Sequence, residues 1–378
     1  MRATPLPRVG LCVGLAAALS SPLPAAAEER FGPRVVVAAP ACAATGSPSA
    51  SDAAYGGGRL RAFSSFSSRT CGGRIVFSSG GSQGFAQSPT PYRGVVQAVA
   101  ADDLATYLLY VVWDDRGEPT GLGVTKRTHA GRFFPTTVLS TVAGTGAVPT
   151  TGDLVARDGR WWAVWSEQVG PGGEFAHQQL FQAGTHPGTT RTKRRMTSTA
   201  ADVDDSVPAL ALDDRGAVIA WTRRAKPALP GPADVWVAVS AGSSWERARA
   251  FATAGQENLD PDVARVGAVT VLAWSRDGRV VEADNSSGAF REHVFAVPGQ
   301  EPRVALAGGS LLVSWSAGAA ETDQSYRVLT ARGQKGGVAW DSAYVSGVGE
   351  TLQSMVGVHG RATVVMGSRS TVFSRTRR

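Results

Sequence analysis

Short apolar runs that end in a bulky residue recur along the chain. In Val111-Val112-Trp113 and Ile219-Ala220-Trp221, apolar side chains point to both faces of the predicted strand. The runs end at Phe63, Trp113, Trp165, Trp221, Trp274, Trp315 and Met366, at steps of 50, 52, 56, 53, 41 and 51 residues. A strand that is apolar on both faces must be covered on both sides. A repeat of this length made of strands and turns predicts a β-propeller, in which neighbouring blades supply the covers.

Six of the seven repeats place a small-residue strand and a glycine turn before the apolar run. Residues 208–212 are followed by the turn Asp213-Asp214-Arg215-Gly216 and then by residues 217–221. Residues 154–157, Asp158-Gly159 and residues 161–165 follow the same order. The glycine suits a tight turn between antiparallel strands. We therefore interpret the first strand as the innermost strand of a blade and the terminal aromatic as core between blades.

The two ends of the chain predict how the ring closes. The last repeat has an inner strand, the Met366 strand and a strand near residues 370–374, but no outer strand. Residues 33–39 form a predicted strand that belongs to no blade of its own. We expect this N-terminal strand to complete the last blade, which removes an exposed sheet edge.

The predicted fold is all-β, a single β-propeller of seven four-stranded blades closed by the N-terminal strand. A ring of six blades stays open as an alternative if residues 44–92 are an irregular insertion. The predicted divisions are a signal peptide at 1–27, a propeller domain at 28–378 with its closing strand at 28–43, and blades at about 44–92, 93–141, 142–200, 201–255, 256–299, 300–347 and 348–378.

The first 27 residues have the pattern of a secretory signal peptide. Arg2 and Arg8 are basic, residues 9–19 are apolar, and Pro24-Ala25-Ala26-Ala27 offers a small-residue cleavage site. We expect cleavage after Ala27 and an exported, extracellular protein, with no later run long enough to span a membrane. Of the two cysteines in the mature chain, Cys42 would follow the closing strand and Cys71 would lie in the first blade. Cysteines of exported proteins usually pair, so we predict a Cys42–Cys71 disulfide across the closure.

The charged residues limit the class of partner. The formal net charge is +7, and the basic residues are scattered rather than gathered with aromatics on one face. Nucleic acid is therefore not expected as a partner. We expect a monomer whose partner is an extracellular carbohydrate or a surface protein. The sequence implies no cofactor and no metal site, because no histidine or cysteine spacing matches a known ligand pattern.

The order Pro208, Ala211, Gly216, Trp221, Val235, Ser240, Trp245 resembles the sialidase-like propellers with Asp-box repeats. Residues 240–245 keep the Ser and the Trp of that box but are two residues short and lack its Asp. The box is a folding motif, so the resemblance implies a fold rather than an activity. For true sialidases, the resemblance would also imply three arginines that bind the carboxylate of the sugar, a tyrosine nucleophile aided by a glutamate, and an acidic aspartate. Their Arg-Ile-Pro signature is absent, with Arg74-Ile75-Val76 the nearest run, so we assign no catalytic residue.

Acidic residues stand near the start of most predicted innermost strands. They are Asp52, Asp153, Asp205, Asp260, Glu301 and Glu350. Innermost strands surround the central channel of a propeller, so these carboxylates are candidate ligand-binding residues at one mouth. Two of them could also serve as acid and base in glycoside cleavage. They could equally cap turns by accepting backbone amides.

These observations favour a non-catalytic function. The leading hypothesis is an exported binding module for a carbohydrate or another extracellular surface ligand. Its alternatives are a glycoside hydrolase or lyase of the sialidase-like type that uses channel-mouth carboxylates, and a protein-interaction scaffold. Whether the protein is an enzyme stays open, with the pattern leaning against it.

Overall fold

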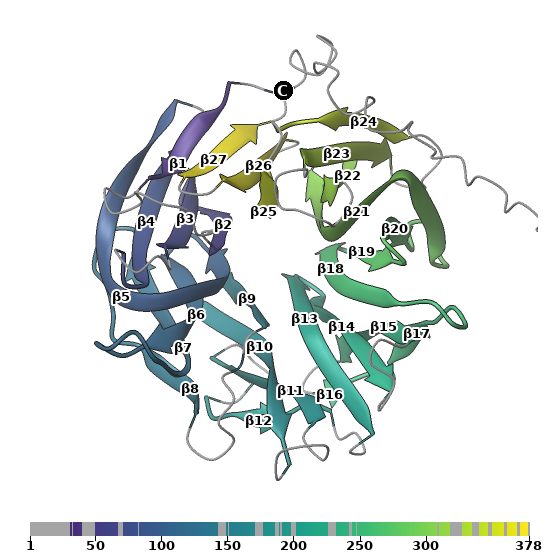
Figure 1. Cartoon of the computed structure of the whole chain (residues 1–378), viewed down its shortest axis with the longest axis horizontal. Helices are drawn as coiled ribbons and strands as arrows, with labels where there is room; N and C mark the ends of the chain where they lie inside the picture. Colours follow the sequence, from purple (N-terminus) through teal and green to yellow (C-terminus); the bar gives the residue numbers. More distant parts are fainter. Residues whose placement is uncertain are drawn as a thin grey trace, which may run out of the picture.

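All regular elements in the described part of this computed structural model are β-strands. The structure describes residues 31, 33–39, 50–66, 71–81, 83–142, 149, 151–170, 177–185, 189, 191–197, 202–225, 232–241, 244–246, 248–307, 310–317, 327–334, 340–346, 350–358, 361–368 and 371–376. Figure 1 shows these strands arranged around a central axis, which is a β-propeller-like arrangement.

Three sheets are short antiparallel groups. The first runs β1 (Val35–Ala38), β27 (Thr371–Thr376), β26 (Arg361–Ser368) and β25 (Thr351–Val358). The second runs β12 (Arg194–Arg195), β11 (His177–Gly184), β10 (Arg160–Val169) and β9 (Gly152–Arg157). The third runs β13 (Val203–Asp213), β14 (Gly216–Ala225), β15 (Ala233–Ala241) and β16 (Ser244–Trp245), with β17 (Arg249–Phe251) also paired to β15.

Two longer sheets have seven strands each. One runs β2 (Ala50–Gly56), β3 (Arg59–Phe66), β4 (Arg74–Gly81), β5 (Gly84–Ala101), β6 (Ala105–Trp113), β7 (Pro119–Thr128) and β8 (Thr137–Thr141). The other runs β18 (Asn258–Val266), β19 (Val269–Arg276), β20 (Arg279–Asp284), β21 (Arg291–Ala307), β22 (Ser310–Ala317), β23 (Arg327–Gln334) and β24 (Trp340–Tyr344). In each sheet the long strand, β5 or β21, pairs by its first half with the strand before it and by its second half with the strand after it.

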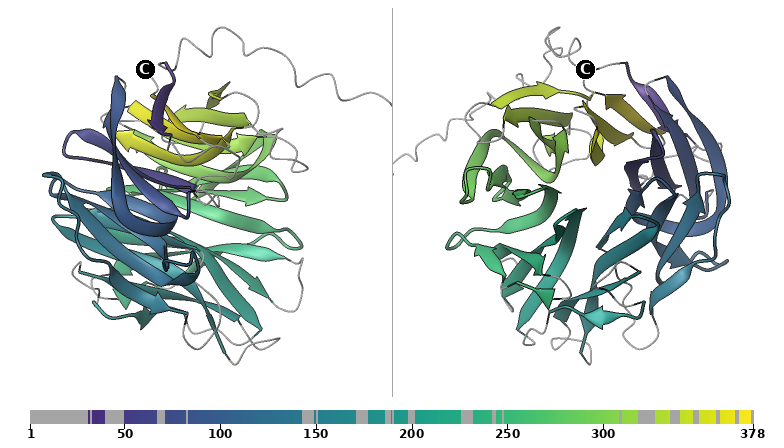
Figure 2. Two further views of the ribbon diagram at one scale, coloured as in Figure 1. Left: turned by 60° about the vertical axis from the view of Figure 1, so that its left-hand side comes forward. Right: turned by 180° about the vertical axis from the view of Figure 1, so that it is seen from behind.

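The inner strands contact one another in a closed cycle. β2 contacts β5, followed in order by β9, β13, β18, β21 and β25, and β25 contacts β2 again. Figure 1 and the view from behind in Figure 2 both show these strands around the axis. Closure leaves each four-stranded group packed between two neighbours, so the middle strands need apolar side chains on both faces.

The N-terminal strand completes the last group, as the sequence predicted. β1 pairs antiparallel with β27, with Val35 opposite Ser374 and Val36 opposite Phe373. In Figure 1, β1 (purple) lies beside β27 (yellow) although they come from opposite ends of the described chain. The side chain of Arg34 lies over the Phe373 ring and pairs with Glu350.

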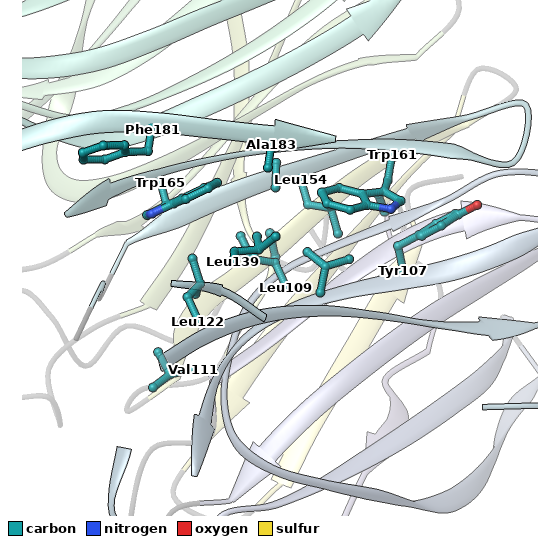
Figure 3. Close-up of a cluster of buried hydrophobic side chains, with 14 of the residues drawn as sticks. Tyr107, Leu109, Val111, Leu122, Leu139, Leu154, Trp161, Trp165, Phe181 and Ala183 are labelled. Carbon is teal, nitrogen blue, oxygen red and sulfur yellow. The ribbon is translucent and has the colours of Figure 1, made fainter. Parts of the chain in front are cut away.

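The bulky ends of the apolar runs form the core between groups. Trp165 and Trp274 are 0 % exposed, and the Met366 and Phe63 side chains are equally buried. Figure 3 shows one such core, where Trp165 and Leu109 belong to adjacent groups. The middle strands supply these residues because both of their faces lie against a neighbouring sheet.

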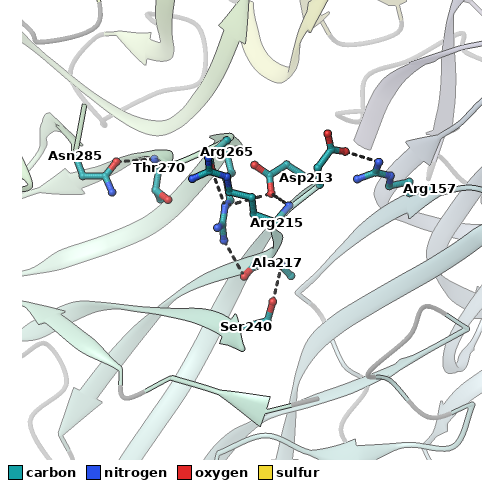
Figure 4. Close-up of polar contacts among 10 residues, drawn as sticks. Arg157, Asp213, Arg215, Ala217, Ser240, Arg265, Thr270 and Asn285 are labelled. Atoms are coloured by element: carbon teal, nitrogen blue, oxygen red, sulfur yellow. Dashed lines mark hydrogen bonds and ion pairs between the residues drawn. The ribbon is translucent and has the colours of Figure 1, made fainter. Parts of the chain in front are cut away.

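The hairpin turns after the inner strands are linked across neighbouring groups. Arg157 of β9 pairs with Asp214 in the turn after β13, and Arg265 of β18 lies 3.4 Å from Asp213. Arg265 also donates a 3.4 Å hydrogen bond to the carbonyl of Ala217. Figure 4 shows these links around the turn that follows β13. These side-chain contacts connect neighbouring groups of strands through segments that are far apart in the sequence.

Two predictions fall outside the described residues. Residues 1–27, the predicted signal peptide, and Cys42 are both in this group, so the leader and the disulfide stay predictions. Among the residues that the structure does describe, no helix is long and apolar enough to span a membrane.

Candidate functional site

The inner strands surround a cavity of about 570 Å³ at the ring axis. Its charged lining comes from different strands: Asp52 from β2, Asp153 from β9, Asp262 from β18, and Glu301 and Arg303 from β21. A concave space with a few converging charged groups is the usual form of a small-molecule site.

Two of the three aspartates, Asp153 and Asp262, occupy the same position in their strands. Asp153 pairs with Val164 and Asp262 pairs with Ala273, and each of these partners comes directly before the tryptophan that ends its apolar run. Asp52 pairs instead with the terminal residue of its run, Phe63, so its register relative to the run differs by one residue. All three aspartates line the cavity at the ring axis.

Each of the three carboxylates bridges two inner strands. One oxygen of Asp52 and of Asp153 accepts the amide of the next residue in its own strand, at 2.8 and 2.7 Å. The Oδ2 atoms accept amides from the next inner strand: Val99 for Asp52 at 2.6 Å, Leu210 for Asp153 at 2.5 Å, and Val304 for Asp262 at 2.7 Å. These bonds fix the carboxylates in place, in agreement with the amide-capping alternative drawn from the sequence.

Burial raises the pKa of all three carboxyls. For Asp153, burial together with the charges of Asp262 and Asp52 raises the pKa to about 7, against the lowering effect of the Leu210 amide. Burial also raises the pKa of Asp52 and of Asp262. In Asp262 the charge of Arg303 opposes the rise most strongly. Near neutral pH, Asp153 is therefore suited to carry a proton, while Arg303 favours the ionised form of Asp262.

Arg303 is the cation of the cavity. Burial lowers the pKa of Arg303, but Asp262, Glu301, Asp52 and Asp153 together raise it above its ordinary value. The guanidinium stays charged and partly neutralises the carboxylates around it. A cavity with both signs of charge can orient a polar, hydroxyl-rich ligand.

Strained backbone surrounds the same cavity. Val207, Asp260 and Glu301 have φ values of 48°, 52° and 51°, and each precedes a proline. All three lie where the pairing of their inner strand shifts register. A positive φ is costly for residues with a side chain and most of all for a β-branched valine, and such strain concentrates at functional sites.

The structure brings together three of the six predicted site residues. Asp52, Asp153 and Glu301 line the cavity, with Glu301 exposed. Asp260 lies beside the lining residue Pro261, and burial raises its pKa, against the charge of Arg303.

The remaining two residues lie elsewhere. Asp205 is 0 % exposed and accepts hydrogen bonds from Trp221 Nε1 at 3.0 Å and Arg223 Nε at 2.6 Å. Its side chain therefore supports the core of its own sheet rather than the cavity. Glu350 pairs with Arg34 near the closing strand and does not line the cavity.

The sequence reading missed Asp262 and Arg303. Asp262 lies 12 residues before Trp274, just as Asp153 lies 12 residues before Trp165, so the two positions match. That match could have identified Asp262 in preference to Asp260. Arg303 had no such signal because arginines are scattered through the chain. Among the described residues, no group of three or more His, Cys, Asp or Glu side chains is arranged to hold a metal ion.

Similar solved structures share the propeller fold. An α-L-arabinofuranosidase mutant from Fusarium graminearum is 9 % identical, with a TM-score of 0.54, over 81 % of this chain and 98 % of that one. An α-L-arabinanase from Penicillium chrysogenum is 10 % identical, with a TM-score of 0.53, over 82 % and 99 %. The polysaccharide lyase Uly1 is 10 % identical, with a TM-score of 0.52, over 84 % and 88 %. No family model matches the sequence, and no curated protein matches it.

These similarities change the functional hypothesis. The propeller part of the sialidase-like resemblance is supported, whereas Asp-box repeats are not. The expected non-catalytic binding module is contradicted, because the similar structures are mostly catalytic glycoside hydrolases and lyases. The sequence hypothesis failed here because it gave weight to the absence of a sialidase signature, and a propeller can carry carboxylate chemistry without that signature.

Proposed function

We propose that this protein is a carbohydrate-active enzyme that cleaves glycosidic bonds in the central cavity. The observation that carries the proposal is the convergence of Asp52, Asp153 and Asp262 on one cavity, with the pKa of Asp153 raised to about 7. Glycoside hydrolysis needs one protonated and one ionised carboxyl on either side of the scissile bond. Asp153 can supply the protonated carboxyl near neutral pH, and Arg303 favours the ionised form of Asp262.

In the proposed reaction Asp153 is the general acid. It donates its proton to the glycosidic oxygen as the bond to the leaving sugar breaks. Asp262, whose ionised form Arg303 favours, acts as the base that activates water or as the nucleophile. Hydrogen bonds from the backbone amides of Leu210 and Val304 hold the two carboxyls in position. The carboxyls therefore lose little conformational freedom when substrate binds.

The first substrates to test follow from the similar enzymes. Arabinan is the natural first polymer, because two of the similar structures are an arabinanase and an arabinofuranosidase. Uronate-containing polysaccharides come second, because one similar structure is a polysaccharide lyase and Arg303 could neutralise a substrate carboxylate.

The test is an assay of product release by the purified protein. Released reducing ends report hydrolysis, and ultraviolet absorbance of an unsaturated uronate reports elimination. We expect release from at least one polymer and its loss in Asp153→Asn and Asp262→Asn. Asp213→Asn is the matched control, since Asp213 is a carboxylate paired with an arginine outside the cavity. Release that persists in Asp153→Asn, or no release from any polymer by the wild type, would overturn the proposal.

We further propose that the ring contains seven blades. The support is that each seven-stranded sheet divides at its long strand, where residues 84–93 pair with β4 and residues 94–101 with β6. The same division occurs within β21. Dividing both sheets in this way leaves every blade with one inner strand in the closed cycle. An electron-density map that shows six blades would refute this count.

A Cys42–Cys71 disulfide is proposed to fasten the closing strand in an exported protein. The support is that Cys71, 1 % exposed, packs in one cluster with Val37 and Ala38 of β1, only a few residues before Cys42. Cys42→Ser should lower the free energy of unfolding by about 3 kcal/mol, in line with loops of this size. An unchanged melting temperature after reduction would contradict the bridge, and a mature N-terminus other than Glu28 would contradict the predicted leader.

A further inference from the structure

The contact between β3–β4 and β6–β7 changes from apolar to polar along its length. Its apolar part contains Phe63, Phe77 and Leu108. Two residues further along the same strand faces lie Arg61, Ser79 and Thr106, because side chains alternate in a strand. The register pairs Arg61 with Ser79, and Thr106 with Arg127. With His129, which lies just after β7, these residues form what we call the basic pocket.

Four polar atoms of the basic pocket lack a hydrogen-bond partner within the described part of the chain. Ser79 Oγ, Thr106 Oγ1, Arg127 Nε and His129 Nε2 are buried atoms without a hydrogen-bond partner among the described residues. Thr106 is 1 % exposed and Arg61 is 7 % exposed. A buried polar group without a partner is costly, so four in one place indicate a missing partner molecule.

The pocket's two arginines have no carboxylate partner in the described part of the chain. Arg61 Nε donates to the carbonyl of Gly56 at 3.3 Å, and Arg127 Nη1 to that of Thr128 at 3.4 Å. The nearby Asp102 is already engaged, since its oxygens accept backbone amides of residues 104, 105 and 159. Arg61 is buried and Arg127 is half-buried. A guanidinium group withdrawn from water without an anion is unusual, because burial of a charge is costly unless it is paired.

The turn at Gly57 brings the cationic groups together. A Cβ atom on Gly57 would lie 2.4 Å from His129 Nδ1 and 3.4 Å from Arg61 Nη2, so both nitrogens lie close to one point. Arg127 is held over the rings of Phe77 and Phe133, at 4.2 and 5.3 Å from the ring centroids. Gly57 and the next glycine are exposed, which leaves the pocket beside solvent.

Electrostatics agree with this geometry. Burial, followed by the charges of Arg127 and Arg59, lowers the pKa of Arg61. Burial also lowers the pKa of Arg127. Burial and the charge of Arg61 lower the pKa of His129, whereas Asp102 and Asp103 raise it. The positive groups repel one another, and a bound anion would relieve that repulsion.

We propose that the basic pocket is a binding site for a small tetrahedral oxyanion such as sulfate or phosphate. Two guanidinium groups can donate paired hydrogen bonds to such an anion, and the hydroxyls of Ser79 and Thr106 can donate the others. The shared chemistry is a sulfate or phosphate group, either free in solution or esterified to a sugar. The site is separate from the central cavity and does not rest on the proposed enzymatic function.

The experiment is calorimetric titration of the full protein with sodium sulfate and sodium phosphate against sodium chloride at equal ionic strength. We expect saturable binding of sulfate and phosphate alone, weakened at least ten-fold in Arg127→Gln. Arg249→Gln is the matched control, because Arg249 also lies over two phenylalanine rings, Phe251 and Phe290, but is exposed. Equal heats with sulfate and chloride, or unchanged affinity in Arg127→Gln, would show that the pocket holds only water and would overturn the proposal.

A second variant covers the case in which Arg127→Gln does not fold. The pKa of His129 lies below its ordinary value of 6.5, so the histidine gains its positive charge in the acid range, and wild-type sulfate affinity should increase as the pH is lowered from 7 to 5. His129→Gln should lose this increase; a persisting pH dependence would count against the site. Glucose 6-sulfate distinguishes the sources of the anion. If glucose 6-sulfate binds more tightly than sulfate, the ligand is a sugar ester. If it binds more weakly, the ligand is the free ion. If neither compound binds, the proposal is overturned.

Discussion

The central cavity and the basic pocket both keep charged side chains away from bulk water, yet they satisfy those charges in different ways. In the cavity, the carboxylates of Asp52, Asp153 and Asp262 accept backbone amides and lie near Arg303. In the basic pocket, Arg61 is buried, and buried polar atoms of the residues around it have no hydrogen-bond partner among the described residues. The cavity is therefore complete without a ligand and can tune proton affinity, whereas the pocket needs an anion.

The largest expected difference between the two regions is in catalysis. Asp153→Asn removes the proton donor and should lower the rate of glycosidic cleavage about 10³-fold, in the usual range for a general acid. Arg127→Gln should leave that rate unchanged, since it lies in another pocket. The check is the turnover rate per folded enzyme, with folding verified by circular dichroism. An equal loss in both variants would show that the two regions are not independent.

A satisfied charge should be costly to disrupt. Asp205→Ala leaves Arg223 and the indole NH of Trp221 without their buried acceptor, and it should lower the free energy of unfolding by about 3 kcal/mol. Urea denaturation measures this loss. A loss below about 1 kcal/mol would mean that Arg223, which is partly exposed, gains enough from solvent to replace the pair.

The pH dependence of stability separates the carboxyls of the cavity from ordinary carboxyls. The pKa of Asp153 is raised from 3.8 to about 7, so between these pH values the folded state holds a proton that the unfolded chain has released. The free energy of unfolding should then fall as the pH rises through this window. Asn cannot ionise, so the stability of Asp153→Asn relative to wild type should rise from pH 4 to pH 7. If denaturation curves give the same difference in free energy of unfolding between the two proteins at every pH, the raised pKa of Asp153 is refuted.

An unsatisfied group should be cheap to remove. Thr106→Val replaces a buried hydroxyl that lacks a partner with a methyl group of similar shape, and it should stabilise the anion-free protein by up to about 1 kcal/mol. Melting in chloride buffer measures this. In saturating sulfate the gain should shrink, because the hydroxyl then donates to the anion. Destabilisation in both buffers would argue that the hydroxyl has a partner within the protein.

The smallest effect should come from His129, which is half-buried. Its pKa is lowered by burial, so below the ordinary value of 6.5 the unfolded chain takes up a proton that the folded state has not. The free energy of unfolding should therefore rise with pH up to about 6.5, which is opposite in sign to the effect of Asp153. His129→Gln should remove this rise in stability curves measured without sulfate. A wild-type curve that the substitution leaves unchanged would place the histidine in solvent.

The candidate site could be predicted from sequence only in part. Asp52 and Asp153 lie in strands whose pairing is regular from the turn back to the carboxylate, so counting residues placed them on the axis. In β18 the pairing is regular from the turn only as far as Asp262 and shifts between Leu259 and Asp262, so the acidic residue chosen at the start of the strand, Asp260, lies in the irregular part, whereas Asp262 lines the cavity. A shift of one residue turns a side chain to the other face of a strand.

The sequence by itself determined the repeat, the all-β architecture and the use of the N-terminal strand for closure. It could do so because strands packed between blades must be apolar on both faces, and such strands produce runs of consecutive apolar residues in the sequence. Only the tertiary structure decided which charges meet. Asp153 and Asp262 lie on separate sheets, and Arg61 and Arg127 on separate strands, so their approach depends on bulges and on packing between blades, which no local pattern records.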